Sequence, residues 1–375
     1  MSGGFPPIIG PAWATAAGVR RSLSESGDSR SRPYPLAMAR SACCLAVVSE
    51  GVRCPAAHLA AREETLRRVC CPLPGSLPLD NRRPVNIRAA HDRRTLLDAL
   101  TGRFPQISAS EWETRCDAGR FFSLTGVVRG KHHRVRAGEQ ILQVFPLETE
   151  PPVAADIRIL HEEAALIVVH KPAPLPMHPS GRFRRNTLQH LLHLAYAPET
   201  PLPVHRLDAN TAGVVLFART RDDCRRLQQQ FLAGTVDKRY LVRVSGHPPH
   251  DTFCCTAPVS AQPSKLGTHA VNDLTGRQAR TDFQVIHRHA DGTTLLEATL
   301  GTGRTNQIRI HLWHLGYPVA GDPAYLADRL LGDTQTLAVD ARPLQLLAWK
   351  LKFRHPRGGD PMEFEATRPD WAWNP

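Results

Sequence analysis

The chain carries its apolar residues in short runs, and this feature most limits the folds open to it. Ile157–Leu160, Ala165–His170 and Gly213–Ala218 have the length and composition of buried strands. Thr187–Tyr196 and Arg221–Ala233 instead show the spacing of amphipathic helices. No run approaches the roughly 18 apolar residues that a membrane-spanning helix needs. We therefore expect a globular protein that does not span a membrane.

The predicted strands and helices follow each other without a regular βαβ repeat. Further strands are predicted at Tyr240–Ser245, Thr281–Ile286, Thr294–Thr299 and Leu347–Phe353, and a further helix at Thr305–Leu315. A doubly wound sheet would need alternating strands and helices. The pattern therefore indicates an α+β fold.

The charge of the chain is strongly basic. Its 375 residues hold 47 Lys and Arg against 35 Asp and Glu, for a formal net charge of +12. Such an excess favours a polyanionic partner, because basic side chains neutralise phosphates and release their counterions. All but six of these residues are Arg, a bias that codon usage also explains. Charge alone therefore leaves nucleic-acid binding open.

The nine cysteines include three adjacent pairs and no C-x-x-C motif. This pattern does not form a disulfide framework, so we expect reduced thiols in a cytoplasmic protein. The alternative is a zinc site, and its ligands would be Cys43, Cys44, Cys54 and His58. Vicinal cysteines rarely chelate one ion well, so we expect no metal.

The first 88 residues differ from the rest of the chain. They hold scattered Pro, Gly and Arg and a polar stretch at Ser22–Ser31, and only Ala56–Val69 shows helical spacing. We expect residues 1–88 to be a disordered leader, or sequence translated upstream of the true start. Deleting them is expected to leave activity nearly unchanged.

Residues 89–148 predict a small unit of two helices, a strand, a turn and a strand. This order resembles the S4-like α/β module, with turns at Asp117–Arg120 and Ala137–Glu139. The resemblance implies an RNA-binding role for the basic residues Arg129, Lys131 and Arg134. Glu111 and Glu113 dilute the basic face, and the alternative is a packing domain without RNA contact.

Four segments carry residues suited to chemistry. They are Lys171-Pro172 with Met177-His178-Pro179, H-R-L-D-A-N-T-A-G from His205 to Gly213, K-R-Y from Lys238 to Tyr240, and G-R-T-N-Q-I-R-I-H from Gly303 to His311. Each segment alone is weak, since an Asp in a loop is usually a turn or cap residue. Gly301-x-Gly303 lacks the Gly-Lys-Ser/Thr ending of a phosphate loop, so we expect no nucleotide cofactor.

In this order the four segments resemble the RluA family of pseudouridine synthases, over residues 157–370. The resemblance implies a catalytic domain at 153–375, with a mixed, mainly antiparallel sheet flanked by helices and loops. It implies isomerisation of a uridine already in RNA, without cofactor. The glycosidic C–N bond breaks, the base rotates, and a C–C bond forms.

The resemblance also implies three catalytic residues. Asp208 is the nucleophile, Tyr240 stacks on the target base and helps to remove its C5 proton, and Arg309 pairs with Asp208. A covalent intermediate would divide one hard step into easier ones. A carboxylate in a closed pocket needs an opposite charge to stay ionised, and the Arg fork suits this task. Attack on the ribose C1′ and attack on the base C6 both stay open.

Substrate contacts are expected from the residues around these three. They are Arg206, His205, Arg304, Thr305, Gln307 and Lys238, with Arg182 as a further RNA contact. Arg206 would enter the RNA stack and hold the flipped uridine out. Base extrusion is cheapest in a loop, so we expect a structured single-stranded loop as target. H-P-S-G-R at His178–Arg182, and Asn306 where the family commonly has His, resemble the branch of the family that includes transfer-RNA enzymes. The resemblance implies transfer RNA as substrate, and ribosomal RNA stays open.

Two other functions compete with an RNA-modifying monomer. The first is a catalytically inactive RNA-binding or assembly protein on the same fold, which the intact Asp208, Tyr240 and Arg309 disfavour. The second is a hydrolase that uses Asp208 with His205. The sequence contains neither G-x-S-x-G nor H-E-x-x-H to support a hydrolase.

Overall fold

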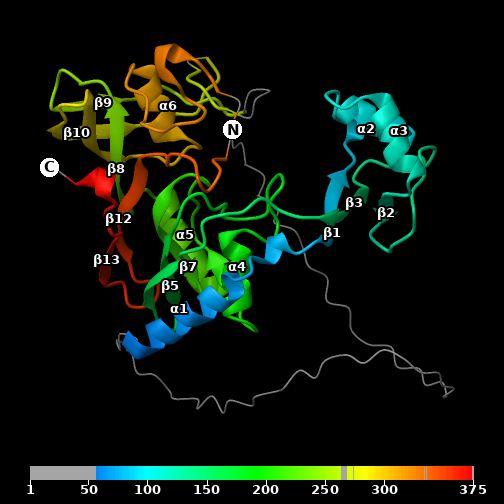
Figure 1. Cartoon of the computed structure of the whole chain (residues 1–375), viewed down its shortest axis with the longest axis horizontal. Coiled ribbons are helices and arrows are strands. Elements are labelled where there is room, and N and C mark those ends of the chain that lie inside the picture. The colour runs from blue at the N-terminus through cyan, green and yellow to red at the C-terminus, as the bar shows by residue number, and fades with distance from the viewer. Residues whose placement is uncertain (1–55, 263–267, 273, 333, 335, 374–375) are drawn as a thin grey trace, which may run out of the picture. The chain divides into compact units, whose positions relative to one another are not determined.

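The computed structural model describes residues 56–262, 268–272, 274–332, 334 and 336–373 (Figure 1). Residues 1–55 of the leader expected at residues 1–88 lie outside these ranges, as do three of the four residues of the zinc alternative. Within them, no helix combines the length and apolarity needed to cross a membrane.

A ten-stranded mixed sheet forms the centre of the larger domain. Its strands run in the order β4 (Arg158–Glu162), β5 (Leu166–Lys171), β7 (Ala212–Ala218), β12 (Leu346–Arg354), β8 (Asp237–Ser245), β11 (Thr293–Leu300), β10 (Thr281–Arg288) and β9 (Thr252–Cys255). β6 (Leu202–Pro203) pairs with β7, and β13 (Pro361–Glu365) pairs with β12. Among the described strands, β7 and β12 make the one parallel pair. The predicted α+β fold with a mixed, mainly antiparallel sheet is confirmed.

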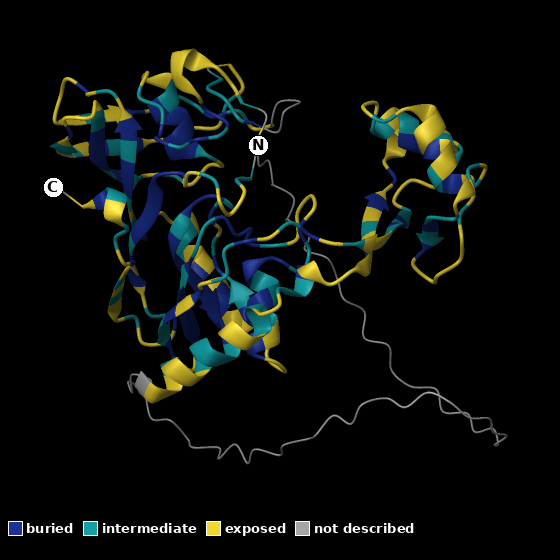
Figure 2. Ribbon diagram, viewed as in Figure 1, coloured by how far each residue is buried: buried dark blue, intermediate teal, exposed yellow. Residues whose placement is uncertain are grey.

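Helices cover both faces of this sheet because its central strands are apolar on both sides. On β7, Val215 and Phe217 pack with α4 (Leu188–Ala195), whereas Val214 and Leu216 pack with α5 (Arg221–Leu232). This alternation follows from the two-residue period of a strand, and Figure 2 shows the buried interior. Thr187 and Thr220 cap α4 and α5 by accepting a backbone N–H three residues on. Both helices lie where the sequence predicts them.

A further helix of the larger domain, α6 (Gln307–His314), lies within the core. Its first six residues are all buried, although three of them are polar or charged. Buried polar groups need partners. The polar motif residues of α6, Gln307, Arg309 and His311, therefore need hydrogen-bond partners within the core.

A three-stranded sheet and two helices make the smaller domain. Its elements are β1 (Leu79–Asn86), α2 (Leu96–Arg103), α3 (Ala109–Asp117), β2 (Phe121–Ser123) and β3 (Gln140–Glu148). Leu100, Trp112, Phe121 and Ile141 share its core. The predicted helices are present, but the domain begins at β1 rather than at residue 89, because β1 pairs with β3.

Helix α1 (Ala56–Cys70) corrects the prediction for the N-terminal segment. Leu66 is 1% exposed and packs in the core cluster that holds α4. The Glu63 carboxylate accepts the backbone N–H of Ile159 on the edge strand β4 at 3.0 Å. Arg62 donates to the Ala195 carbonyl at 2.7 Å. Residues 56–88 are therefore part of the folded protein, and the prediction of a disordered leader is wrong for them.

We expect Leu66→Ala to lower the free energy of unfolding by about 3 kcal/mol, because it opens a cavity in the core. Leu232, which is 86% exposed, offers the matched control, and Leu232→Ala should change stability by less than about 0.5 kcal/mol. Urea titration measures both. Deletion of residues 1–88 should likewise destabilise the larger domain. Equal stability of the two leucine variants would show that α1 does not contribute to the core.

Candidate active site

Asp208 lies in the loop that connects β6 to β7. The Asp208 carbonyl accepts the Thr211 N–H at 3.1 Å, and the Ala209 carbonyl accepts the Leu175 N–H at 2.8 Å. Gly213 follows at φ +128°, where a Cβ would lie 2.1 Å from the Ala348 carbonyl oxygen on β12. The motif glycine is thus required by the close approach of β7 and β12. These contacts place the half-buried Asp208 at the start of β7.

A single cavity brings together the three predicted catalytic residues. Asp208, Tyr240 and Arg309 line it, and they come from a loop, from β8 and from α6. Four of the predicted substrate contacts also line the cavity: Arg206, Arg304, Thr305 and Gln307. Segments about 30 to 100 residues apart in sequence therefore meet at one place, as the motifs predict.

Tyr240 is a neutral phenol in this cavity. Burial raises the pKa of its hydroxyl well above the usual range, and the Asp208 charge raises it further. A neutral phenol can donate a hydrogen bond and present its ring to a base. Removal of the neighbouring negative charge would ease loss of the phenol proton and so formation of the phenolate, the form that can accept a proton.

The family resemblance implies that Arg309 pairs with Asp208, but in the structure Arg309 forms its ion pair with Asp322. Its Nε and Nη2 donate to the two carboxylate oxygens of Asp322, each at 2.7 Å. Asp322 lies in the turn after α6, and its side chain has no exposed surface. Burial alone would lower the pKa of Arg309, but the Asp322 hydrogen bonds and charge, joined by the Asp208 charge, raise it. Asp208 acts on Arg309 through space, and Asp322 holds the guanidinium fork.

Lys171 is a site residue that the sequence did not single out for a role. Its side chain is fully buried at the end of β5, and Nζ donates to the carbonyls of Pro172, Leu175 and Ala209 at 3.0, 2.8 and 3.1 Å. Burial lowers the pKa of its ammonium group to about 7, although the Asp208 charge opposes this shift. Lys171 therefore ties the β5 end to the residue after Asp208. The sequence signal that could have identified Lys171 is its position as a lysine at the end of an apolar strand.

Gln307 has a different role from the predicted substrate contact. Its Oε1 accepts from Arg304 N and Thr302 Oγ1, at 3.0 and 2.7 Å. Its Nε2 donates to Arg280 O and Thr281 Oγ1, at 2.9 and 3.0 Å. These bonds use the full capacity of the amide, so none is left for RNA. Gln307 shapes the 302–306 loop instead.

His205 and Lys238 line a neighbouring hollow, which they share with Tyr240. His205 Nε2 accepts the Leu216 N–H at 3.2 Å, and its ring stacks on Phe231. Burial, aided by the Lys238 charge, lowers the pKa of His205 to about 4. His205 is therefore a neutral structural acceptor. It does not line the Asp208 cavity, so the hydrolase alternative lacks its acid–base partner there.

The remaining predicted RNA contacts lie at the surface. Arg206 and Arg182 are exposed. In the smaller domain, Lys131 is ion-paired with Glu113 and Asp117 at 2.7 and 3.2 Å, as the acidic residues on α3 foreshadow. The Arg129 Nε lies 3.9 Å from the Glu139 carboxylate, and Arg134 donates to the Arg93 carbonyl at 3.0 Å. Lys131 thus offers less free charge than the sequence suggests.

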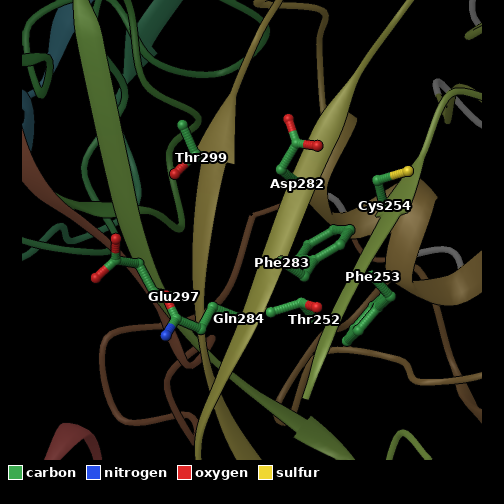
Figure 3. Close-up of a pocket in the computed structure, with 8 residues that line it drawn as sticks. All are labelled: Thr252, Phe253, Cys254, Asp282, Phe283, Gln284, Glu297 and Thr299. Atoms are coloured by element: carbon green, nitrogen blue, oxygen red, sulfur yellow. The ribbon is translucent and has the colours of Figure 1, made fainter. Parts of the chain in front are cut away.

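A larger hollow lies on the open face of β9, β10 and β11 (Figure 3). It contains none of the predicted site residues. Its carboxylates are already paired, Asp282 with Arg280 at 2.7 Å and Glu297 with Arg239 at 3.1 Å. A surface with these carboxylates offers little to RNA phosphates. In the described ranges, no three His, Cys, Asp or Glu side chains come together as metal ligands would.

Comparison with known proteins places this chain in a family. The family described as RNA pseudouridylate synthase matches residues 165–314. Ribosomal large subunit pseudouridine synthase D of Nitrosomonas europaea is 37% identical over 286 residues, which cover 72% of this chain and 80% of that protein. The Xanthomonas campestris protein of the same name is 34% identical over 312 residues, which cover 79% and 92%.

The human pseudouridylate synthase RPUSD2 is 38% identical over 177 residues, or 47% of this chain. The chain spans only about a third of the length of RPUSD2, since the match covers 32% of it. The bacterial alignments cover most of both chains. This chain belongs to the RluA family of RNA pseudouridine synthases, as its motifs predict.

Histidines that are buried or half-buried predict how stability depends on pH. Burial lowers the pKa of six of them: His170, His178, His190, His205, His289 and His311. Between pH 6.5 and the lower folded-state pKa values, the unfolded chain binds more protons, so stability falls as the pH falls. His205 alone, with a pKa of about 4, should cost about 2 kcal/mol between pH 6.5 and pH 5.

Thermal melting between pH 7.5 and pH 5 measures this loss. His205→Gln is the matched control, because a glutamine oxygen can accept the Leu216 N–H without titrating. Its melting temperature should fall less steeply with acid than that of the wild type. Parallel curves would contradict a neutral, buried His205.

Proposed function

We propose that this protein is an RNA pseudouridine synthase in which Asp208 is the nucleophile. One observation supports this above the others: Asp208, Tyr240 and Arg309 line one cavity in a chain of the RluA family. Two arginines, Arg206 and Arg304, line the same cavity and supply positive charge for the RNA backbone. The proposed activity thus combines a nucleophile, an aromatic platform and a cationic entrance.

The reaction balances without a cosubstrate because uridine and pseudouridine are isomers. The Asp208 carboxylate adds to the nucleotide, at C1′ or at C6, and the C1′–N1 bond breaks. The base rotates, C5 bonds to C1′, and the C5 proton leaves while N1 gains a proton. Asp208 then departs unchanged. Arg309 lines the same cavity and places a positive charge near the Asp208 carboxylate before attack.

Tyr240 acts after the nucleophile in this scheme. Esterification removes the charge of Asp208, which is one of the two causes that raise the pKa of the Tyr240 hydroxyl. The phenol then gives up its proton more readily, for transfer to N1, and the resulting phenolate can accept the proton that leaves C5. This order applies to attack at C6, because attack at C1′ restores the Asp208 charge as soon as C5 bonds to C1′. Its ring meanwhile stacks on the flipped base.

A structured RNA loop is the proposed substrate, in transfer RNA or ribosomal RNA. The names of two bacterial relatives refer to the ribosomal large subunit, which supports ribosomal RNA as the first substrate to test. We place the protein in the cytoplasm as a monomer, and assign the smaller domain, residues 79–148, to RNA binding by its S4-like order of elements. Its exposed Arg134 supports that assignment.

The test uses RNA that contains no pseudouridine. Purified full-length protein is incubated with in vitro transcripts of ribosomal RNA and transfer RNA, and pseudouridine is mapped by chemical derivatisation and primer extension. We expect conversion at one or a few loop uridines. A protein that binds these transcripts and converts none would support the inactive RNA-binding alternative instead.

A further inference from the structure

A buried tyrosine links the active site to the connection between β9 and β10. The two described flanks of this connection, residues 257–262 and 268–272, pair through the antiparallel bridge of Val259 and Val271. The Ser260 N–H donates to the Ala270 carbonyl at 2.8 Å. We refer to these residues as the connection flanks. They form an ordered unit beside the cavity.

The Tyr325 hydroxyl binds the connection flanks on one side. It donates to the His269 carbonyl at 2.8 Å and accepts the His269 N–H at 3.2 Å. On the other side it accepts from Asn306 Nδ2 at 3.3 Å. One donor and two acceptor positions are thus all used, in a side chain with no exposed surface. The hydroxyl therefore joins two separate elements.

The same tyrosine supports Arg309. Its ring centroid lies 4.9 Å from the guanidinium carbon, a cation–π contact in a buried site. The Asn306 that reaches its hydroxyl also accepts from Arg309 Nη1 at 2.9 Å. Asn306 adopts φ +56°, a left-handed conformation that Asn tolerates better than most residues. A continuous chain of contacts therefore runs from His269 through Tyr325 and Asn306 to Arg309.

The connection also borders the RNA side of the cavity. The cavity residue Arg304 donates from Nε to the Gln278 carbonyl at 3.1 Å. Arg277, in the same connection, is exposed. An RNA strand that enters the cavity would meet Arg304, and Arg277 adds exposed positive charge to the connection that holds Arg304. The connection is therefore placed to sense bound RNA.

We propose that Tyr325 is a positioning residue that couples RNA binding at the connection to the orientation of Arg309. The coupling rests on the proposed function, because it acts on the nucleophile through Arg309. Contact with RNA fixes the position of the connection flanks, and Tyr325 transmits this constraint to Asn306 and the guanidinium group. Asn306 links the Tyr325 hydroxyl to Arg309, whereas Tyr325 contacts both Asn306 and the connection flanks.

This asymmetry gives the test. Tyr325→Phe keeps the ring and removes all three hydroxyl hydrogen bonds. Asn306→Gly removes the link to Arg309 without straining a backbone at φ +56°. RNA affinity and the single-turnover rate at saturating RNA are measured for each variant, for the double variant and for wild type, on the transcript that wild type converts. Thermal melting of each protein accompanies them.

We expect Asn306→Gly to lower the single-turnover rate about tenfold while affinity stays within about twofold, as loss of one or two hydrogen bonds implies. Tyr325→Phe should lower the rate by the same factor and also weaken RNA binding several-fold. The double variant should match Tyr325→Phe, because both changes break one chain.

Rate losses that multiply in the double variant would overturn the coupling. So would a Tyr325→Phe protein that equals wild type in rate and affinity, or one that differs only in melting temperature. A wild type inert on every transcript would overturn the proposed function and the coupling with it, so the two failures are distinguishable.

Discussion

Asp208→Asn is expected to abolish uridine conversion, with a loss of at least about a thousandfold in the single-turnover rate. The amide nearly matches the carboxylate in size but lacks the negative charge and the nucleophilic oxygen. Asp208 is the one carboxylate among the described residues that line the cavity with Tyr240 and Arg309. No other described carboxylate in that lining can therefore replace it. Quantitative pseudouridine mapping on one transcript measures the loss.

RNA affinity should survive this change. Removing a negative charge beside a cationic entrance does not weaken phosphate contacts. Asp340→Asn, at an exposed position outside the cavity, is the matched control and should keep the wild-type rate. An Asp208→Asn protein that keeps more than about a tenth of the wild-type rate would assign the nucleophile elsewhere. Equal RNA binding by wild type and Asp208→Asn, with no conversion of uridine by either, would indicate the inactive RNA-binding alternative.

The sequence predicted those parts of the structure that local patterns determine. The apolar runs at Ala165–His170 and Gly213–Ala218 correspond to β5 and β7, which are buried on both faces. Thr187 and Thr220 mark the starts of α4 and α5 because a cap interacts with its own helix. The order of the motifs predicted that Asp208, Tyr240 and Arg309 would share one cavity, because that order is a feature of the family fold and not of local sequence preference.

Contacts between distant elements escaped prediction. The Arg309–Asp322 pair depends on how the chain turns after α6, and the periodicity of a helix contains no information about that turn. The helix α1 was visible in the spacing of its apolar residues, but its packing on α4 and β4 depends on tertiary contacts such as Glu63 with Ile159. Gln307 and His205 were assigned to the substrate because motif membership does not separate a structural amide or ring from a contact.

Lys171→Met should lose both stability and activity. The change leaves the carbonyls of Pro172 and Leu175 without the donor they have in wild type, and removes one of the two donors to the Ala209 carbonyl. Each unsatisfied buried group costs about 1–3 kcal/mol, partly offset because the buried ammonium is itself costly. We expect a net loss of about 2–4 kcal/mol in the free energy of unfolding.

The activity loss should exceed what unfolding explains. Lys171 holds the residue after Asp208, and a displacement of about 1 Å in a reacting group can cost about a hundredfold in rate. Single-turnover assays at a temperature where the variant is fully folded isolate this effect. Lys352→Met is the matched control, because Lys352 is 54% exposed and ion-paired only at the surface. It should keep both stability and rate.

The pH dependence distinguishes a buried ammonium from a simple packing role. Burial lowers the pKa of Lys171 to about 7 from an ordinary 10.5, so between these values the unfolded chain binds the extra proton. The destabilising cost of burial is therefore full below pH 7 and disappears as the pH approaches 10.5. Wild type should gain stability from pH 7 to pH 10 relative to Lys171→Met, while Lys352→Met follows wild type. A constant difference across that range would mean that Lys171 stays charged and acts through its three hydrogen bonds alone.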